Sequence, residues 1–161
     1  MKKLTLIFLT CLIFLSPNVV MSETMDDLVE RNGLYYKKFS DTPFTGKITG
    51  KYQGSYKNGK REGAWFFYDF DGYLEAKGNY KNDKRDGPWV HFYKNGQLST
   101  QHTYKNGNKE GPWVTYHKNG QLRSKGTYKN GYKDGPWVSY KKDGTVWEEY
   151  TGTYKNGLKV K

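Results

Sequence analysis

The chain has a single cysteine, Cys11, among 161 residues. It lies in an apolar run from Leu4 to Leu15, which follows the basic Lys2-Lys3 and ends before Ser16-Pro17. This order is typical of a secretory signal peptide, and the run is shorter than the about 20 residues of a membrane-spanning helix. We predict a cleavable signal peptide over residues 1–22, with an uncleaved anchor as the alternative. Cleavage would leave no cysteine and so no disulfide or thiol chemistry.

The sequence also lacks a helical pattern and a dense basic run. Glycines and Asn-Gly pairs recur about every dozen residues, and no apolar stripe of helical period survives between them. The formal net charge is +11, and loss of Lys2 and Lys3 with the signal peptide would leave +9. This charge is spread over the chain with Asp and Glu interleaved, which argues against a nucleic-acid partner. Export argues against one as well.

What the sequence does contain is a repeat of 24 residues. Gly87-Pro88-Trp89-Val90 returns as Gly111-Pro112-Trp113-Val114 and as Gly135-Pro136-Trp137-Val138, with a rougher copy at Gly63-Ala64-Trp65-Phe66. The Tyr-Lys-Asn-Gly element recurs in phase at 56–59, 104–107 and 128–131, with Asp83 in place of glycine in the copy at 80–83. A last copy at 154–157 comes two residues late, after an insertion around 147–149. A fixed period of this kind indicates a repeat architecture.

Each unit holds two turns, and each turn is flanked by runs of about eight residues. Asn and Gly tolerate the positive φ of tight hairpin turns, so Asn82-Asp83 should be the least comfortable turn. Strands joined by such short turns are antiparallel neighbours. We therefore predict an all-β fold, an elongated antiparallel meander of repeated β-hairpins. Its parts are a linker and divergent capping hairpin at 23–55, with a loose leader over 23–27, and four repeats with a C-terminal cap at 56–161.

The alternation of side chains leaves the tryptophans ambiguous. Val90 and Phe92 share a face with their counterparts in the other repeats, and we expect the sheet to bury this face. The tryptophans have the opposite parity on their strands. Either a bulge after the Gly-Pro step re-aims the indole, or the indole covers the other face. Repeat residues assigned a structural role are Trp65, Trp89, Trp113, Trp137, Gly72, Gly96, Gly120 and Gly144.

The unit Gly-Pro-Trp-Val-x-Tyr-x-x-Asn-Gly-Gln-Leu, followed by Tyr-Lys-Asn-Gly, resembles the MORN-repeat variant of bacterial proteins. Many of these carry the label "toxin–antitoxin system YwqK family antitoxin". The resemblance covers about residues 54–157. It implies a row of β-hairpins in a single sheet or half-pipe, serving as a scaffold or interaction module with membrane phospholipid or protein partners. It implies no catalytic residues.

Catalytic and metal sites find little support in the sequence. His91, His102 and His117 have no metal-ligand spacing, and we expect them to be exposed strand residues. The carboxylates Glu62, Asp86, Glu110 and Asp134 form one column, with neighbours two strands or about 10 Å apart. That distance exceeds the separation in a retaining glycosidase, so we expect turn stabilisation and local ion pairing from them. We predict no enzyme activity, no cofactor and no metal.

The candidate binding surface is a basic and aromatic row. Each repeat tyrosine is followed by a lysine, which suggests a cation beside a ring at every repeat, although solvated turns that keep the protein soluble are the alternative. The residues are Lys57, Lys81, Lys105, Lys129, Lys155, Tyr80, Tyr104 and Tyr128. We predict an exported binding or scaffold module, periplasmic, envelope-associated or secreted, that mediates protein–protein interaction. The alternatives are binding to anionic lipid or envelope polysaccharide, and neutralisation of a toxin.

Overall fold

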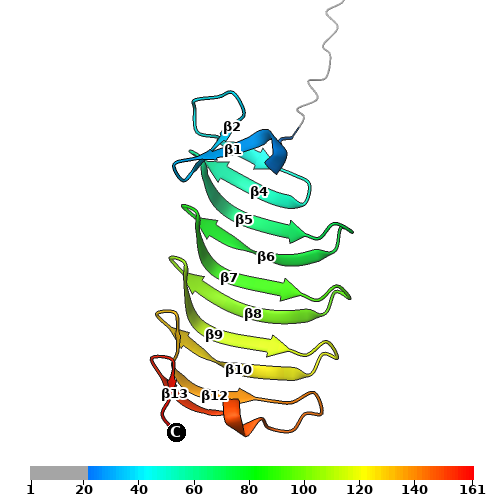
Figure 1. The fold of residues 1–161 in the computed structure, drawn as a ribbon, viewed down its shortest axis with the longest axis vertical. Coiled ribbons are helices and arrows are strands. Elements are labelled where there is room, and N and C mark those ends of the chain that lie inside the picture. Colours follow the sequence, from blue (N-terminus) through cyan, green and yellow to red (C-terminus); the bar gives the residue numbers. More distant parts are fainter. Residues whose placement is uncertain (1–21) are drawn as a thin grey trace, which may run out of the picture.

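A computed structural model describes residues 22–161, and twelve of their strands form one antiparallel sheet (Figure 1). The strands lie in the order β14-β13-β12-β10-β9-β8-β7-β6-β5-β4-β3, with β11 also paired to β10. Each strand therefore lies beside its neighbours in the chain, which confirms the predicted all-β meander of hairpins. The predicted signal peptide lies outside the described residues, apart from Ser22. Within residues 22–161 no helix is long and apolar enough to cross a membrane.

The repeats pair a nine-residue strand with an eight-residue strand. The strands of this part are β4 (Tyr52–Lys57), β5 (Lys60–Tyr68), β6 (Leu74–Lys81), β7 (Lys84–Phe92), β8 (Leu98–Lys105), β9 (Asn108–Tyr116) and β10 (Leu122–Lys129). In the last unit the long strand is divided into β11 (Tyr132–Lys133) and β12 (Gly135–Ser139). The 3-10 helix η2 (Glu148–Tyr150), β13 (Gly152–Lys155) and β14 (Leu158–Lys159) complete the chain.

The N-terminal segment covers the first edge of the sheet. The 3-10 helix η1 (Met25–Asp27) leads into a separate hairpin of β1 (Leu28–Arg31) and β2 (Leu34–Lys37), and β3 (Gly46–Ile48) follows. The expectation that residues 23–27 form a loose leader is wrong. Glu23 bridges to Ile48, the Thr49 amide donates to the Glu23 carbonyl at 2.8 Å, and a capping box holds η1. Backbone pairing therefore orders the polar segment, a contact that its composition could not reveal.

The tight turns adopt the conformation that their residues favour. Asn58, Asn106 and Asn130 have φ values of 50°, 51° and 51°, and each is followed by a glycine with positive φ. At Asn82-Asp83 the aspartate itself has a φ of 67°. Its carboxylate accepts from Arg61 Nε at 2.5 Å, an ion pair that offsets part of the cost of the left-handed backbone.

The core lies on the face of the tryptophans, and the valine face is the outer one. Trp89 pairs directly with Gly78, and Val90 pairs with Lys77, so Trp89 and Val90 point to opposite faces. We call these two sides the Trp face and the Val face. The second of the two alternatives for the indoles is therefore right, and the expected burial of the valine face is wrong. A bulge does occur at the Gly-Pro step, where Asn79 alone faces residues 86–88 and Gly87 has a φ of 82°. It precedes Trp89 and does not decide which way the indole points.

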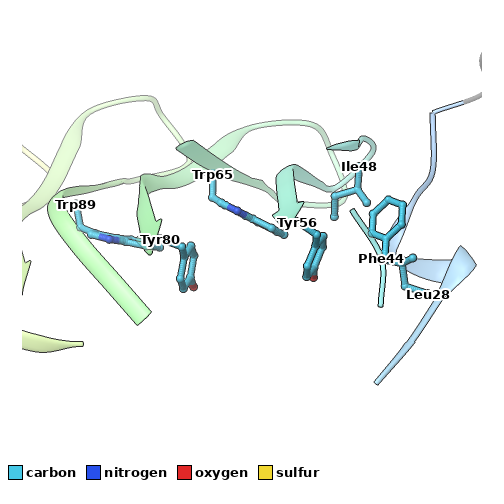
Figure 2. Close-up of a cluster of buried hydrophobic side chains, with 7 residues drawn as sticks. All are labelled: Leu28, Phe44, Ile48, Tyr56, Trp65, Tyr80 and Trp89. Atoms are coloured by element: carbon cyan, nitrogen blue, oxygen red, sulfur yellow. The ribbon is translucent and has the colours of Figure 1, made fainter. Parts of the chain in front are cut away.

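The core is a single file of aromatic rings along the Trp face (Figure 2). Tyr56, Trp65, Tyr80 and Trp89 follow one another edge to face, with centroid distances of 5.2, 5.7 and 5.2 Å. Leu28, Phe44 and Ile48 close the N-terminal end of the file. Edge-to-face ring pairs stabilise a fold by more than the apolar area they bury. Because each pair joins neighbouring hairpins, contacts between successive hairpins stabilise this sheet.

Glycines opposite the tryptophans make this packing possible. A Cβ atom on Gly78 would lie 2.2 Å from the ring of Trp89, and one on Gly126 would lie 2.2 Å from Trp137. The indole thus lies flat against the neighbouring backbone, where Trp89 Nε1 donates to the Asn79 carbonyl at 3.1 Å. Trp65 and Trp137 make the equivalent bonds to Ser55 and Thr127.

Candidate binding surface

The predicted lysines form an exposed row on the Val face. Each follows a tyrosine that points to the Trp face, and successive residues of a strand point to opposite faces. Across the tight turns, Lys57 lies opposite Lys60, and Lys81 lies opposite Lys84. We call the set of exposed lysines along these turns the lysine row: Lys57, Lys60, Lys81, Lys84, Lys105, Lys129 and Lys155.

The structure does not bring the predicted tyrosines to this surface. Tyr80 is 6% exposed and lies edge-on to Trp65 and Trp89 in the aromatic file. Tyr104 and Tyr128 are half-buried on the same side. Adjacent residues of a strand cannot share a face, so the lysines and tyrosines of the Tyr-Lys-Asn-Gly element form two separate surfaces.

A second column of cations takes the place beside the tyrosines. Arg61 Cζ lies 4.2 Å from the ring centroid of Tyr80, and Arg85 Cζ lies 4.3 Å from that of Trp89. Lys109 Nζ and Lys133 Nζ each lie 4.4 Å from their tryptophans, Trp113 and Trp137. Burial lowers the pKa of both lysines. The predictions from the sequence did not identify these four cations as part of a surface, since they were treated only as neighbours of the acidic column. Their recurrence every 24 residues could have identified them.

The acidic column caps turns. Glu62 Oε2 accepts from the Asn82 amide at 2.9 Å, Asp86 Oδ1 from the Asn106 amide at 3.1 Å, and Glu110 Oε2 from the Asn130 amide at 2.8 Å. Each carboxylate thus holds the turn of the next repeat. The predicted role in turn stabilisation is confirmed for these three residues.

Replacing Glu110 by alanine is expected to lower the free energy of unfolding by about 1 kcal/mol, because the Asn130 amide loses a charged acceptor. Urea denaturation of the purified protein measures the change. Glu110→Gln is the matched control, since its amide oxygen can still accept, and it should lose less. Equal losses in the two variants would contradict the capping role.

The expectation of exposed histidines is wrong for His102, which is 4% exposed. It stands one repeat from both Gly78 and Gly126, where the other units keep a glycine against the tryptophan. Its ring stacks on Trp113 at 4.5 Å and on His91 at 5.4 Å. Neither ring nitrogen has a hydrogen-bond partner among the described residues. Burial, followed by the charge of His91 and of nearby cations, lowers the pKa of His102 to about 4.

This histidine also displaces Trp113 from the repeat position. Trp65, Trp89 and Trp137 are 1–4% exposed, whereas Trp113 is only half-buried. In residues 22–161 the Nε1 atoms of those three bond to a backbone carbonyl, and that of Trp113 does not. A comparison of equivalent positions in successive repeats could have predicted this change, because His102 stands where Gly78 and Gly126 stand in the neighbouring repeats.

The other two histidines occupy less confined positions. His91 is half-buried, and burial lowers its pKa. His117 Nε2 lies 3.0 Å from the Tyr140 carbonyl oxygen, to which it donates as the Nε2–H tautomer. Among residues 22–161, no group of three or more His, Cys, Asp and Glu side chains is placed to hold a metal ion.

The turn glycines Gly72, Gly96, Gly120 and Gly144 have φ values of 83°, 79°, 82° and 86°. They lie in exposed turns between the strands of each repeat, and a side chain there would be strained by the backbone.

The repeats are recognised by comparison with known families. The family model described as MORN repeat variant matches residues 61–82, 85–106 and 109–130. These are three consecutive hairpin units of the sheet, and repeats of this type indicate a binding module. No curated protein matches the chain.

Proposed function

We propose that the chain is an exported binding module that holds an acidic protein partner against its lysine row. The three consecutive MORN-type repeats support a binding role, and the basic and apolar N-terminal run supports export to the envelope or beyond. The row repeats every two strands, which is about 10 Å, and an extended acidic segment could meet several of its ammonium groups at once.

The observation that carries the proposal is that two turns of the lysine row place one lysine directly opposite another. Like charges directly opposite each other in a sheet are destabilising, yet Lys57 faces Lys60 and Lys81 faces Lys84. Within residues 22–161 no ion pair involves a lysine of the row. Three of the neighbouring carboxylates are used to cap turns. An acidic partner would supply the missing counter-charges.

A protein partner suits the rest of the Val face better than a bilayer does. Between the basic residues this face carries half-buried Val90, Val114 and Val138 next to exposed Gln101. Mixed polar and apolar positions at the level of the sheet are typical of protein interfaces. Neutralisation of a toxin would be one case of this function, with a tight one-to-one complex.

The test compares two triple variants of equal net charge. Lys81, Lys105 and Lys129 are replaced by glutamine in one, and the exposed Lys38, Lys47 and Lys142 in the other. Binding of a fluorescent ten-residue Asp/Glu peptide is measured by anisotropy over a salt series. We expect the first variant to bind at least about tenfold more weakly and the second to change less than about twofold.

Three results would contradict the proposal. Equal losses in both variants would mean that only net charge matters. Binding to vesicles containing an anionic lipid, or to an anionic polysaccharide, that is tighter than binding to the peptide and is lost in the first variant but kept in the second would assign the row to that surface instead. Binding that persists at about 1 M salt would also exclude a mechanism based on the lysines.

A further inference from the structure

A groove of about 530 Å³ opens at the C-terminal end of the Trp face. Its lining includes Trp113, Ser124, Lys133, Trp147 and Tyr150. It lies on the opposite side of the sheet from the lysine row, so a ligand held in it would add a role beyond the proposed function. The groove forms where three features of the chain differ from the regular repeat. Each of these features forms one side or the floor of the groove.

The first departure is His102, which holds Trp113 away from the backbone position that the other tryptophans occupy. As a result the indole of Trp113 is half-buried and lines the groove. The neighbouring Tyr128 ring stands edge-on to Trp113 at 5.1 Å. One wall of the groove is therefore aromatic.

The second departure is a row of hydroxyls on the floor. Across paired strands, one row of the Trp face begins with Phe67, Ala76 and His91 in the first repeats. The same row continues as Thr100, Thr115, Ser124 and Ser139, all of which line the groove. The Thr115 and Ser124 hydroxyls lie 2.8 Å apart. From β8 onward, where the groove begins, this row carries only hydroxyl side chains.

The third departure is the insertion around 147–149, which builds the opposite wall. The Trp147 amide donates to the Ser139 carbonyl at 2.8 Å, and Lys159 Nζ donates to the Glu148 carbonyl at 2.9 Å. These bonds hold η2, the short helix beside β12 and β13 in Figure 1. Trp147 and Tyr150 stand edge to face at 4.7 Å and remain 38% and 42% exposed.

Both charged residues in the groove lining are cations. The lining contains Arg123 and Lys133 and no aspartate or glutamate. Lys133 Nζ lies over the rings of Trp137 and Tyr154, and within residues 22–161 no carboxylate pairs with it. A cationic group so placed favours a ligand that carries a negative charge.

We propose that this groove binds an acidic sugar unit of an oligosaccharide. Exposed indole and phenol rings offer flat apolar faces for the C–H side of a sugar ring, and the row of hydroxyls can donate to and accept from its hydroxyl groups. Lys133 and Arg123 meet the acidic group. Apolar walls combined with a few convergent polar groups are the usual composition of a small-molecule site. An aliphatic ligand would offer no partner to the Thr100 hydroxyl or to the remaining hydrogen-bonding capacity of Thr115 and Ser124, which bond to each other.

The binding test uses three ligands of similar length: trigalacturonate, which is an acidic sugar; maltotriose, which is a neutral sugar; and triglutamate, which is an acidic peptide. Tryptophan fluorescence and calorimetry follow titration of the purified protein to about 10 mM ligand. We expect trigalacturonate to bind at least about tenfold more tightly than the other two. Tighter binding of glucuronate or of glucose 6-phosphate than of glucose supports the proposal, and the comparison identifies the acidic group.

Variants locate the site. Trp147→Ala, at an exposed position, should weaken binding of trigalacturonate by about tenfold, and Tyr73→Ala, an exposed aromatic on a distant turn, should leave it unchanged. Lys133→Gln should reduce the preference for the acidic over the neutral sugar, whereas Lys129→Gln on the Val face should not. His102→Gly should weaken binding without loss of folding, because Trp113 can then withdraw to the repeat position. Circular dichroism confirms that each variant is folded.

The proposal is overturned if triglutamate binds as tightly as trigalacturonate, since the groove would then respond to charge alone. It is also overturned if none of the ligands binds up to about 10 mM, or if Trp147→Ala and Tyr73→Ala have the same effect.

Discussion

Replacing Trp89 by alanine is expected to lower the free energy of unfolding by about 3–5 kcal/mol. Trp89 is 1% exposed and stands edge-on to Tyr80 at 5.2 Å and to Tyr104 at 6.1 Å. Its loss removes the contact between two successive hairpins and the hydrogen bond from Nε1 to Asn79. The cavity would lie over Gly78, which has no side chain to fill it. Urea denaturation, followed by circular dichroism, measures the change.

Trp113→Ala is the matched control for Trp89→Ala. Trp113 occupies the same place in the next repeat, but it is half-buried and lacks the Nε1 bond to a backbone carbonyl among the described residues. We expect it to cost less than half as much as Trp89→Ala. Equal costs would contradict the view that His102 has displaced Trp113 from the aromatic file.

Lowering the pH from 7 to 4 is expected to remove up to about 3 kcal/mol of stability through His102. In the folded protein the pKa of His102 is lowered from 6.5 to about 4. Between these two pH values His102 is protonated in the unfolded chain but not in the folded one. The free energy of unfolding therefore keeps its full value above pH 6.5 and falls as the pH approaches 4. His91, whose pKa burial also lowers, acts in the same direction.

The surroundings of His102 explain why its charged form is disfavoured. His91 and Arg85 approach from β7, Lys109 and Trp113 from β9, and Tyr104 from its own strand. Each charged group in this set is a cation, and none offers a counter-charge. Protonation would therefore place a buried charge beside two other cations.

His102→Gly tests this assignment. The variant should lose much of the change in stability between pH 6.5 and pH 4, and at pH 7 it should be at least as stable as the parent, because Trp113 regains the repeat position. Thermal unfolding at a series of pH values measures both effects. An unchanged pH dependence in the variant would assign the acid sensitivity to other groups.

The repeat and its strands could be predicted because turn chemistry is local. Asn58-Gly59 and its counterparts need positive φ, and that need alone divides the chain into hairpins. The choice of buried face could not be made in the same way, since tryptophan and valine on adjacent positions are both apolar. The deciding residue was Gly78, because only a glycine allows an indole to lie against the next strand.

The binding surface shows a similar division. The lysines were correctly placed on the surface from their turn positions, but their grouping with the tyrosines disregarded the alternation of a strand. The groove on the Trp face depends on the strand register and on how the insertion around 147–149 folds back over β12. Neither can be derived from a pattern within one repeat. What the sequence could reveal is where the repeat is broken, at His102 and at Trp147.

The single file of rings has a consequence for the length of the molecule. Trp65, Trp89 and Trp137 each contact the tyrosine before and the tyrosine after in the chain, so the junctions between units are built alike except at His102. Whole units of 24 residues could therefore be gained or lost during evolution without redesign of a shared interior. Each gain or loss of a unit would lengthen or shorten the lysine row by about 10 Å. Gene duplication could therefore adjust the length of the partner segment that the row can bind.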